Sequence, residues 1–218
     1  MRDRQDHQRI IDRSYRTLQA MLNKERPEVH PDLRNSLRSL ILACISAAWT
    51  AFEAAAGDCW EVLVNSCPSR LVPSTLEELE ASESDALSQK QIPVGLLAKH
   101  GFDMRSKMGT VLRKKFDFTS VSGIRKAYKP ILGDGSKLDS ALRNKDLARL
   151  EAIRHLIVHH GGIIDEEFKR RTDSRGQVGV PFPLEGDPVK RFVTASANTG
   201  CILFLECNAW LSKASKHA

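Results

Sequence analysis

The stretch that decides the fold is residues 147–171, LARLEAIRHLIVHHGGIIDEEFKRR. Its apolar residues recur every three or four positions, as on one face of an α-helix: Leu147, Leu150, Ile153 and Ile157. Gly161 and Gly162 follow directly, and glycine is typical of the residues just beyond a helix end. The spacing therefore predicts a helix over about residues 147–162, with a second helical segment beyond the glycines.

The histidines of this predicted helix lie away from its main apolar face. On a helical wheel, His155 and His159 are one turn apart and roughly opposite that face, while Arg154 lies beside it. Leu156 and Val158 flank the histidines, so apolar side chains surround much of the helix. A helix that is apolar nearly all round is usually covered on both sides. We therefore expect it to lie at an interface between two subunits.

The segment Arg154–Phe168, RHLIVHHGGIIDEEF, resembles the signature of the HEPN superfamily (higher eukaryotes and prokaryotes nucleotide-binding domains), of the RiboL-PSP-HEPN or MAE type. That signature is Arg, a polar residue, a short spacer and His, running into a glycine turn and an acidic segment. Many members are metal-independent endoribonucleases whose active site forms where two such helices meet in a dimer. The resemblance implies an all-α, HEPN-like helical bundle of about five to eight helices in a single domain.

The resemblance also implies roles for the residues of the motif. Cleavage of RNA without a metal needs a base for the 2′-hydroxyl, an acid for the leaving 5′-oxygen and a cation on the transition state. His159 can serve as base or acid, and Arg154 can bind phosphate oxygens. His155, at the polar position, is the third expected catalytic residue, and His160 is expected to support the site. Two copies across a twofold axis supply both acid and base, leaving a 2′,3′-cyclic phosphate and a 5′-hydroxyl.

A second segment, AWTAFE at residues 48–53, resembles the helix that pairs with the HEPN signature helix. It belongs to a helix predicted over about Leu33–Asn65, which Asp32 caps and which is apolar on two faces. Glu53 lies in the narrow polar stripe between them. It either orients Arg154 or reaches water at the rim of the core. The densest apolar run, residues 40–56, is shorter than the roughly 20 residues of a membrane span and carries Glu53, so we expect no membrane association.

Composition places the chain among globular proteins. Of its 218 residues, 41% are hydrophobic and 28% charged, while only 6% are aromatic and alternating strand patterns are scarce. The five cysteines form no CxxC pair, and no secretory leader is visible, so reduced thiols in a cytoplasmic protein are expected. The net charge of +6 suits a phosphate-bearing partner without requiring one.

The densest positive charge falls within a helix predicted over residues 105–116, inside a less regular stretch from Gln89 to Lys129. These residues are either contacts for an RNA backbone or an ordinary solvated face: Arg105, Lys107, Arg113, Lys114 and Lys115. The turn that follows, Gly133-Asp134-Gly135, lacks the frame of a phosphate-binding loop, which argues against nucleotide hydrolysis of that type.

The remaining chain is assigned by local signals. Residues 1–30 predict a surface helix, separate from the HEPN-like domain over 31–218. Ser74 or Thr75 caps a predicted acidic helix through about Ser88, following breaks at Pro68 and Pro73. Asp187-Pro188 opens a final helix to about Lys213. Its expected inward residues are Val189, Phe192, Val193, Ser196, Cys201, Phe204, Leu205 and Trp210.

Three other readings compete with RNA cleavage. His155, His159 and His160 near Asp165 and Glu166 could bind zinc, but no catalytic Glu lies between histidines as in HExxH, so neither a metal nor another cofactor is expected. A serine or cysteine hydrolase lacks its nucleophile signature. The stronger rival is a non-catalytic nucleotide-binding, RNA-binding or dimerisation module. For a catalytic HEPN protein, a toxin or antiphage role with an antitoxin or regulatory partner would fit the resemblance.

Overall fold

A computed structural model describes residues 9, 12–14, 16, 17, 20, 21, 30–82, 94–174, 176–184 and 188–214. Within this described part of the chain, every regular element is a helix, and the only β-type pairing is an isolated antiparallel bridge between Ile163 and Pro181. The prediction of an all-α protein is confirmed.

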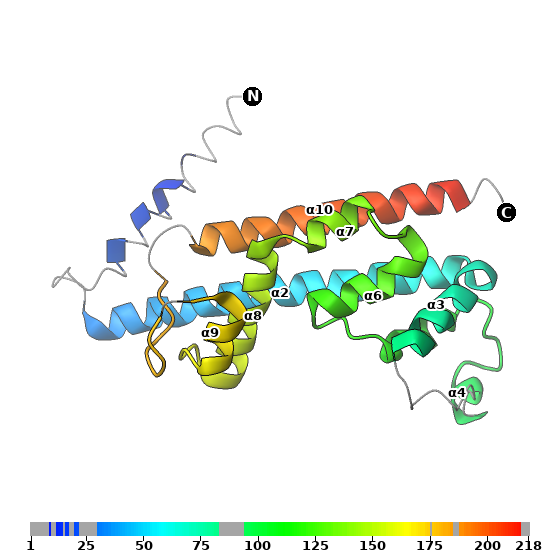
Figure 1. Cartoon of the computed structure of the whole chain (residues 1–218), viewed down its shortest axis with the longest axis horizontal. Coiled ribbons are helices and arrows are strands. Elements are labelled where there is room, and N and C mark those ends of the chain that lie inside the picture. The colour runs from blue at the N-terminus through cyan, green and yellow to red at the C-terminus, as the bar shows by residue number, and fades with distance from the viewer. Residues whose placement is uncertain are drawn as a thin grey trace. The chain divides into compact units, whose positions relative to one another are not determined.

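Figure 1 shows the helices along the chain. In chain order they are α2 (Pro31–Ser66), α3 (Pro68–Ser82), α4 (Val94–Lys99), α5 (Met108–Leu112), the 3₁₀ turn η1 (Arg113–Lys115), α6 (Val121–Leu132), α7 (Lys137–Leu142), α8 (Lys145–His160), α9 (Glu166–Thr172) and α10 (Pro188–Ala214).

The chain divides into two compact units. The first comprises Met1–Trp49 and Arg149–Thr194, and the second comprises Thr50–Ala148 and Ala195–Ala218. The three longest helices, α2, α8 and α10, each contribute residues to both units. Each unit has its own buried side chains and is described separately.

The first unit is built around the start of α2 and most of α8. Its fully buried side chains come mainly from these two helices and from the segment that follows α8: Ile45, Trp49, Leu150, Ile153, Leu156 and Ile164. Phe168 of α9 packs edge-on against Phe182, with ring centroids 5.6 Å apart. Arg38 of α2 donates to the Phe182 carbonyl oxygen at 2.7 Å, which ties the loop after α9 to α2.

The second unit depends on a reciprocal pair of hydrogen bonds between α2 and α6. The Trp60 indole donates to the Ala127 carbonyl at 2.8 Å, and the Tyr128 hydroxyl donates to the Ala56 carbonyl at 2.7 Å. All four residues are buried. Because the polar tips of both aromatic side chains are satisfied, their rings can be buried without an unpaired donor.

Helix α6 was not predicted, because most of it falls in the stretch Gln89–Lys129, where the sequence pattern is irregular. Its buried residues are nevertheless at helical spacing: Val121, Ile124, Ala127, Tyr128 and Ile131. Ser120 caps it by accepting a hydrogen bond from the Gly123 amide. Pro130 lies inside the last turn, and Gly133, with φ of +80°, follows its end.

Several predicted boundaries are corrected. His30, not Asp32, precedes α2, and its imidazole Nδ1 accepts from the Asp32 amide at 3.3 Å. Pro68 opens α3, while Pro73 lies within that helix instead of breaking the chain. The helix predicted over residues 105–116 is only Met108–Leu112. By contrast, the starts of α8 and α10 lie within two residues of prediction.

The inward face predicted for α10 is partly wrong. Phe192 and Ser196 are buried, but Phe204 and Leu205 are 56% and 69% exposed, and Cys201 is exposed as well. The positions that are buried instead include Thr199, Leu203 and Cys207. The assignment failed because α10 is apolar on more than one side, so periodicity alone did not distinguish the covered side.

The predicted surface helix over residues 1–30 and the predicted acidic helix through Ser88 can be compared with the structure only in part. The described residues between Arg9 and Met21 are helical, whereas the remaining positions of the predicted surface helix over 1–30 and the end of the predicted acidic helix, residues 83–88, lie outside the described residues. By length and composition α2 is apolar enough to cross a membrane, a test that the core helix of a soluble protein also passes. The expectation that it does not span a membrane stays a prediction.

Two glycines allow the packing around α6 to be tested. A Cβ at Gly123 would collide with the backbone carbonyl of Asp117, whereas a Cβ at Gly200, within α10, would meet nothing within 4 Å. We expect Gly123→Ala to lower the free energy of unfolding by roughly 2 kcal/mol through overpacking. Gly200→Ala should leave it unchanged or raise it by up to about 1 kcal/mol, since alanine favours helix more than glycine does. Urea unfolding followed by circular dichroism measures both, and equal losses in the two variants would contradict this account.

Candidate functional site

The candidate site lies at the C-terminal end of α8, where two glycines stop the helix. Gly161 and Gly162 have φ of +59° and +78°, the left-handed region that glycine adopts without strain. The Gly161 amide donates to the Ile157 carbonyl and the Gly162 amide to the Leu156 carbonyl, both at 3.1 Å. Gly162 also lies against Leu42 of α2, so that a Cβ there would approach the leucine within 3.3 Å. The end of α8 is therefore set by backbone geometry.

Beyond the glycines, a short antiparallel pairing turns the chain back. The Phe182 amide donates to the Gly162 carbonyl at 2.8 Å, and the Ile164 amide donates to the Val180 carbonyl at 2.9 Å. This pairing positions Asp165 at the N-cap of α9, where its Oδ1 accepts from the Phe168 amide at 2.6 Å. The predicted second helical segment is confirmed, but it begins at Glu166 and not directly after the glycines.

The same turn brings Asp165 back to the last residue of α8. His160 Nε2 lies 3.1 Å from Asp165 Oδ2, and both side chains are partly exposed. A second link holds α9 to α8, because Arg171 Nη2 lies 2.7 Å from Glu151 Oε1. The carboxylate of Asp165 thus caps one helix and orients an imidazole of another.

Three imidazoles gather at this end of α8. The ring centroids of His155 and His159 are 4.4 Å apart, and those of His155 and His160 are 6.4 Å apart. His155 is half-buried, while His159 and His160 are exposed. The structure therefore brings together the three histidines that the motif singled out, with two of them open to solvent.

Arg154 is half-buried on α8, one residue before His155. Val158 follows Arg154 by four positions and His155 by three, so it lies on the same side as both. It is 54% exposed, although it is a large apolar residue. Glu53 is half-buried on the part of α2 that belongs to the second unit. Its predicted role in orienting Arg154 stays a prediction.

The predicted RNA-binding cluster is divided between the turn before α5 and the 3₁₀ turn after it. Arg105 and Lys107 precede α5, while Arg113, Lys114 and Lys115 form η1. Lys107, Lys114 and Lys115 are exposed. Arg105 is exposed as well but contacts Asp103 at 3.3 Å.

Arg113 forms two ion pairs with carboxylates of α2. Its Nη1 lies 2.6 Å from Asp58 Oδ1 and 3.0 Å from Glu61 Oε2 on α2, and Gly57 leaves room for the guanidinium. Burial lowers the pKa of Arg113, but the hydrogen bonds and negative charges of Glu61 and Asp58 outweigh this effect and raise it. Arg113 therefore holds α2 to the segment after α5, and the lysines beside it are the better candidates for contacting phosphate.

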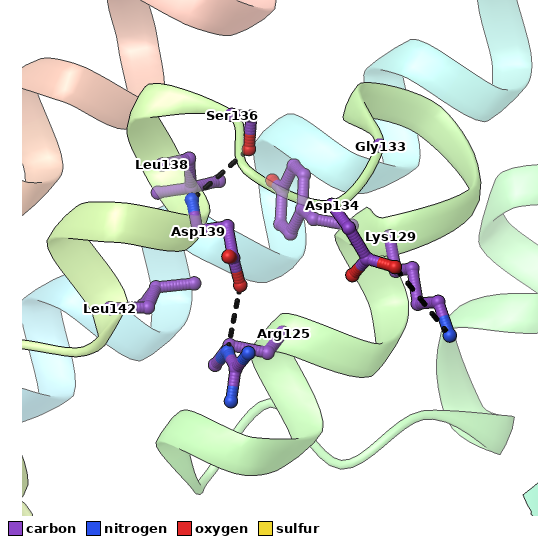
Figure 2. A pocket seen from close by; sticks show the side chains of 9 residues that line it. Arg125, Lys129, Gly133, Asp134, Ser136, Leu138, Asp139 and Leu142 are labelled. Atoms are coloured by element: carbon purple, nitrogen blue, oxygen red, sulfur yellow. Dashed lines mark hydrogen bonds and ion pairs between the residues drawn. The ribbon is translucent and has the colours of Figure 1, made fainter.

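A second charged corner lies between α6 and α7 (Figure 2). The Asp139 carboxylate accepts from Arg125 at 2.9 Å and from Arg143 at 2.9 Å, and these two arginines, Arg125 first, hold its pKa below the usual value. The hollow beside it has a volume of about 10 Å³, which accommodates about one water molecule. Its charges are paired with each other and it has no room for a substrate, so the corner is structural.

The part of the chain that the structure describes contains no group of three or more His, Cys, Asp or Glu side chains arranged to hold a metal ion. The imidazoles at the end of α8 therefore do not form a conventional metal site with Asp165. Their geometry suits hydrogen bonding and proton transfer, because the rings lie close together and two of them are open to solvent.

The chain matches no protein-family model, and comparison with curated proteins and with solved structures finds no match. The resemblance to the HEPN superfamily consequently rests on the residues of α8, on the segment after it and on residues 48–53 of α2.

Asp165 is the residue whose place in the site the sequence analysis missed. The sequence places it in the acidic segment of the motif and among possible zinc ligands, whereas the structure pairs it with His160 and makes it the cap of α9. One signal was present in the sequence: an Asp followed by two glutamates and Phe168 has the composition of a helix start. The contact with His160 was not foreseeable, because it depends on the path of the chain through the two glycines.

The two roles of Asp165 can be separated by substitution. Asparagine can cap a helix but carries no charge, whereas alanine does neither. We expect Asp165→Ala to lower the free energy of unfolding by about 1 kcal/mol and Asp165→Asn to change it little, because a partly exposed ion pair contributes little stability. Thermal or urea unfolding of the two variants checks this. Equal losses of stability in Asp165→Asn and Asp165→Ala would contradict this account, because they would mean that the Asp165 carboxylate does not stabilise the protein by capping α9.

Proposed function

We propose that this chain is a metal-independent endoribonuclease of the HEPN type, with a site shared between two copies. The observation that carries the proposal is the clustering of Arg154, His155, His159 and His160 in the last two turns of α8, next to exposed surface. A guanidinium and several imidazoles are the groups that cleavage of a phosphodiester by its own 2′-hydroxyl requires.

Each residue has a role in this proposal. His159, exposed and 4.4 Å from His155 between ring centroids, takes or gives the proton at the reacting oxygens. Arg154 stabilises charge on the phosphate oxygens through its planar array of donors. His160, paired with Asp165, supports the cluster. Because the C-terminal end of a helix carries partial negative charge, the positive charge for the phosphate must come from side chains, which makes a second Arg154 valuable.

Val158 supports the assembly of the site from two copies. An exposed valine on the same side as Arg154 and His155 would be covered if the ends of two α8 helices met across a twofold axis. That arrangement places two guanidinium groups and two sets of imidazoles around one cleft, so that one copy supplies the acid and the other the base.

A second candidate function is favoured by the half-burial of Arg154 and His155. Side chains that are partly covered are as well suited to binding a nucleotide or RNA, or to holding a dimer, as to catalysis. In either case we propose RNA as the macromolecular partner. A toxin or antiphage effector, with an antitoxin as antagonist, is the cellular setting that the catalytic candidate fits.

RNA cleavage in the presence of EDTA tests the catalytic candidate. We expect the purified chain to cut single-stranded or structured RNA without a metal, leaving 2′,3′-cyclic phosphate ends. Arg154→Ala and His159→Ala should each reduce the rate by about 10²-fold or more. Arg149→Ala, an exposed arginine of the same helix, and His100→Ala, in the second unit, are the matched controls and should retain the rate. Cleavage that survives both site substitutions would reject the assignment, and RNA binding without any cleavage would favour the non-catalytic candidate.

Two valines of equal exposure test the shared site. Val158 is 54% exposed on α8, and Val62 is 53% exposed on α2 in the second unit. We expect the wild-type chain to sediment as a dimer, Val158→Glu to sediment as a monomer with strongly reduced cleavage, and Val62→Glu to remain dimeric and active. Introduced charges at the centre of an interface repel each other and lose hydration. A monomeric wild-type chain, or a Val158→Glu dimer, would contradict the proposal.

A further inference from the structure

An aromatic side chain is held open to solvent at the turn after α4. Phe102 is 69% exposed, and its φ of +62° lies in the left-handed region that glycine prefers. Among the described residues other than glycine, Asp173 alone shares such a φ, and aspartate tolerates it better than a bulky aromatic residue does. Phe102 therefore occupies an unfavourable backbone conformation that burial of its ring does not offset.

Backbone hydrogen bonds fix this turn. The Gly101 amide donates to the Ala98 carbonyl at 3.0 Å, and the Phe102 amide donates to the Leu97 carbonyl at 2.9 Å. These are the two bonds of a Schellman motif, in which an apolar residue after the glycine often packs back onto its helix. Phe102 remains largely exposed instead. The turn thus presents the aromatic ring to solvent on a fixed piece of backbone.

Positive charge surrounds this ring in the sequence. Residues 94–116 include six Lys or Arg residues and one acidic residue, Asp103. The Asp103 carboxylate accepts from the Arg105 amide at 3.1 Å and from its guanidinium at 3.3 Å. Lys99 and Lys107, on either side of the ring in sequence, are exposed. A partner of this turn therefore meets an aromatic ring, several cations and a single carboxylate that Arg105 already engages.

Phe204 of α10 is the other phenylalanine that is largely exposed, at 56%. Its exposed neighbours one turn away on α10, Cys201 and Asn208, are uncharged. An exposed aromatic side chain by itself suits partners of many kinds. At Phe102 the accompanying cations favour a polyanion that also carries flat rings, which is the chemistry of a nucleic-acid strand.

We propose that the turn around Phe102 binds single-stranded nucleic acid, with one base stacked on the Phe102 ring and the neighbouring phosphates in contact with Lys99, Arg105 and Lys107. Stacking accepts any base, because every base has a π face, and the cations follow the backbone. The bases of a duplex are stacked on each other and do not reach the ring. The inference rests on the proposed function only in taking RNA as the natural strand. It is independent of cleavage, since this turn and the end of α8 belong to different units.

Fluorescence anisotropy of the full chain with labelled oligonucleotides tests the binding site. The probes are oligouridine and oligothymidine of about 15 nucleotides, and an RNA duplex of the same length. Oligothymidine has no 2′-hydroxyl, so it reports binding without cleavage, and the His159→Ala chain serves the same purpose with oligouridine. We expect both single strands to bind several-fold more tightly than the duplex. Tighter binding of oligouridine identifies RNA as the natural strand, while equal or tighter binding of oligothymidine assigns the site to single strands of either sugar.

Matched variants separate stacking from other contacts. Phe102→Ala should weaken binding of both single strands by about 10-fold, and Phe102→Leu nearly as much, because leucine keeps apolar area but has no flat ring. Phe102→Trp should retain binding, and Phe204→Ala is the control that should bind like the wild type. Lys107→Ala should reduce the slope of log affinity against log salt by about 0.7, the value for one phosphate contact on a single strand.

Circular dichroism checks that each variant folds. Phe102→Gly should melt no lower than the wild type while losing binding, because glycine adopts this φ without strain, and it replaces Phe102→Ala if the alanine variant unfolds. Wild-type affinity in folded Phe102→Ala or Phe102→Gly, an equal loss in Phe204→Ala, or no binding of either single strand would overturn the inference. Full binding by Phe102→Leu would do so as well, because it would indicate an apolar contact such as a protein partner makes. Binding of RNA without cleavage supports this inference and counts against the catalytic candidate alone.

Discussion

The two left-handed glycines after α8 are the constraint on which the candidate site depends. A side chain at either position would strain the backbone, and at Gly162 it would also press on Leu42. With glycine there, α8 ends at His160 and the chain reverses into the pairing between residues 162–164 and 179–182. That reversal returns Asp165 to His160. The site is thus a consequence of where one helix stops.

A different constraint organises the second unit. Trp60 and Tyr128 each bury an aromatic ring and each donate to a backbone carbonyl of the helix that the other occupies. Since an unpaired donor in an apolar interior is costly, this reciprocal arrangement fixes α2 and α6 in register. Phe116 and Phe118 complete the cluster around the Trp60 ring, at 4.9 and 5.7 Å between centroids.

Positive charge has two uses in this chain. Arg113, Arg125, Arg143 and Arg171 form ion pairs with carboxylates within their own units and hold helices or turns together. Lys107, Lys114 and Lys115 project into solvent. The net charge of +6 therefore does not measure the charge that a phosphate-bearing partner would meet, because part of it is engaged in structural contacts.

The amino-acid sequence by itself determined the all-α class, the length of α2, the start and end of α8, and the helical spacing that gathers His155 and His159. These are local properties, set by periodicity and by glycine and proline at the helix ends. Tertiary structure alone decided the pairing of His160 with Asp165, the engagement of Arg113 by Asp58 and Glu61, and which side of α10 is covered. Helix α6 shows the limit most clearly: its spacing was present, but a proline and two glycines obscured it, and packing against Trp60 stabilises the helix. Contacts between residues distant in sequence depend on the path of the whole chain, which periodicity does not encode.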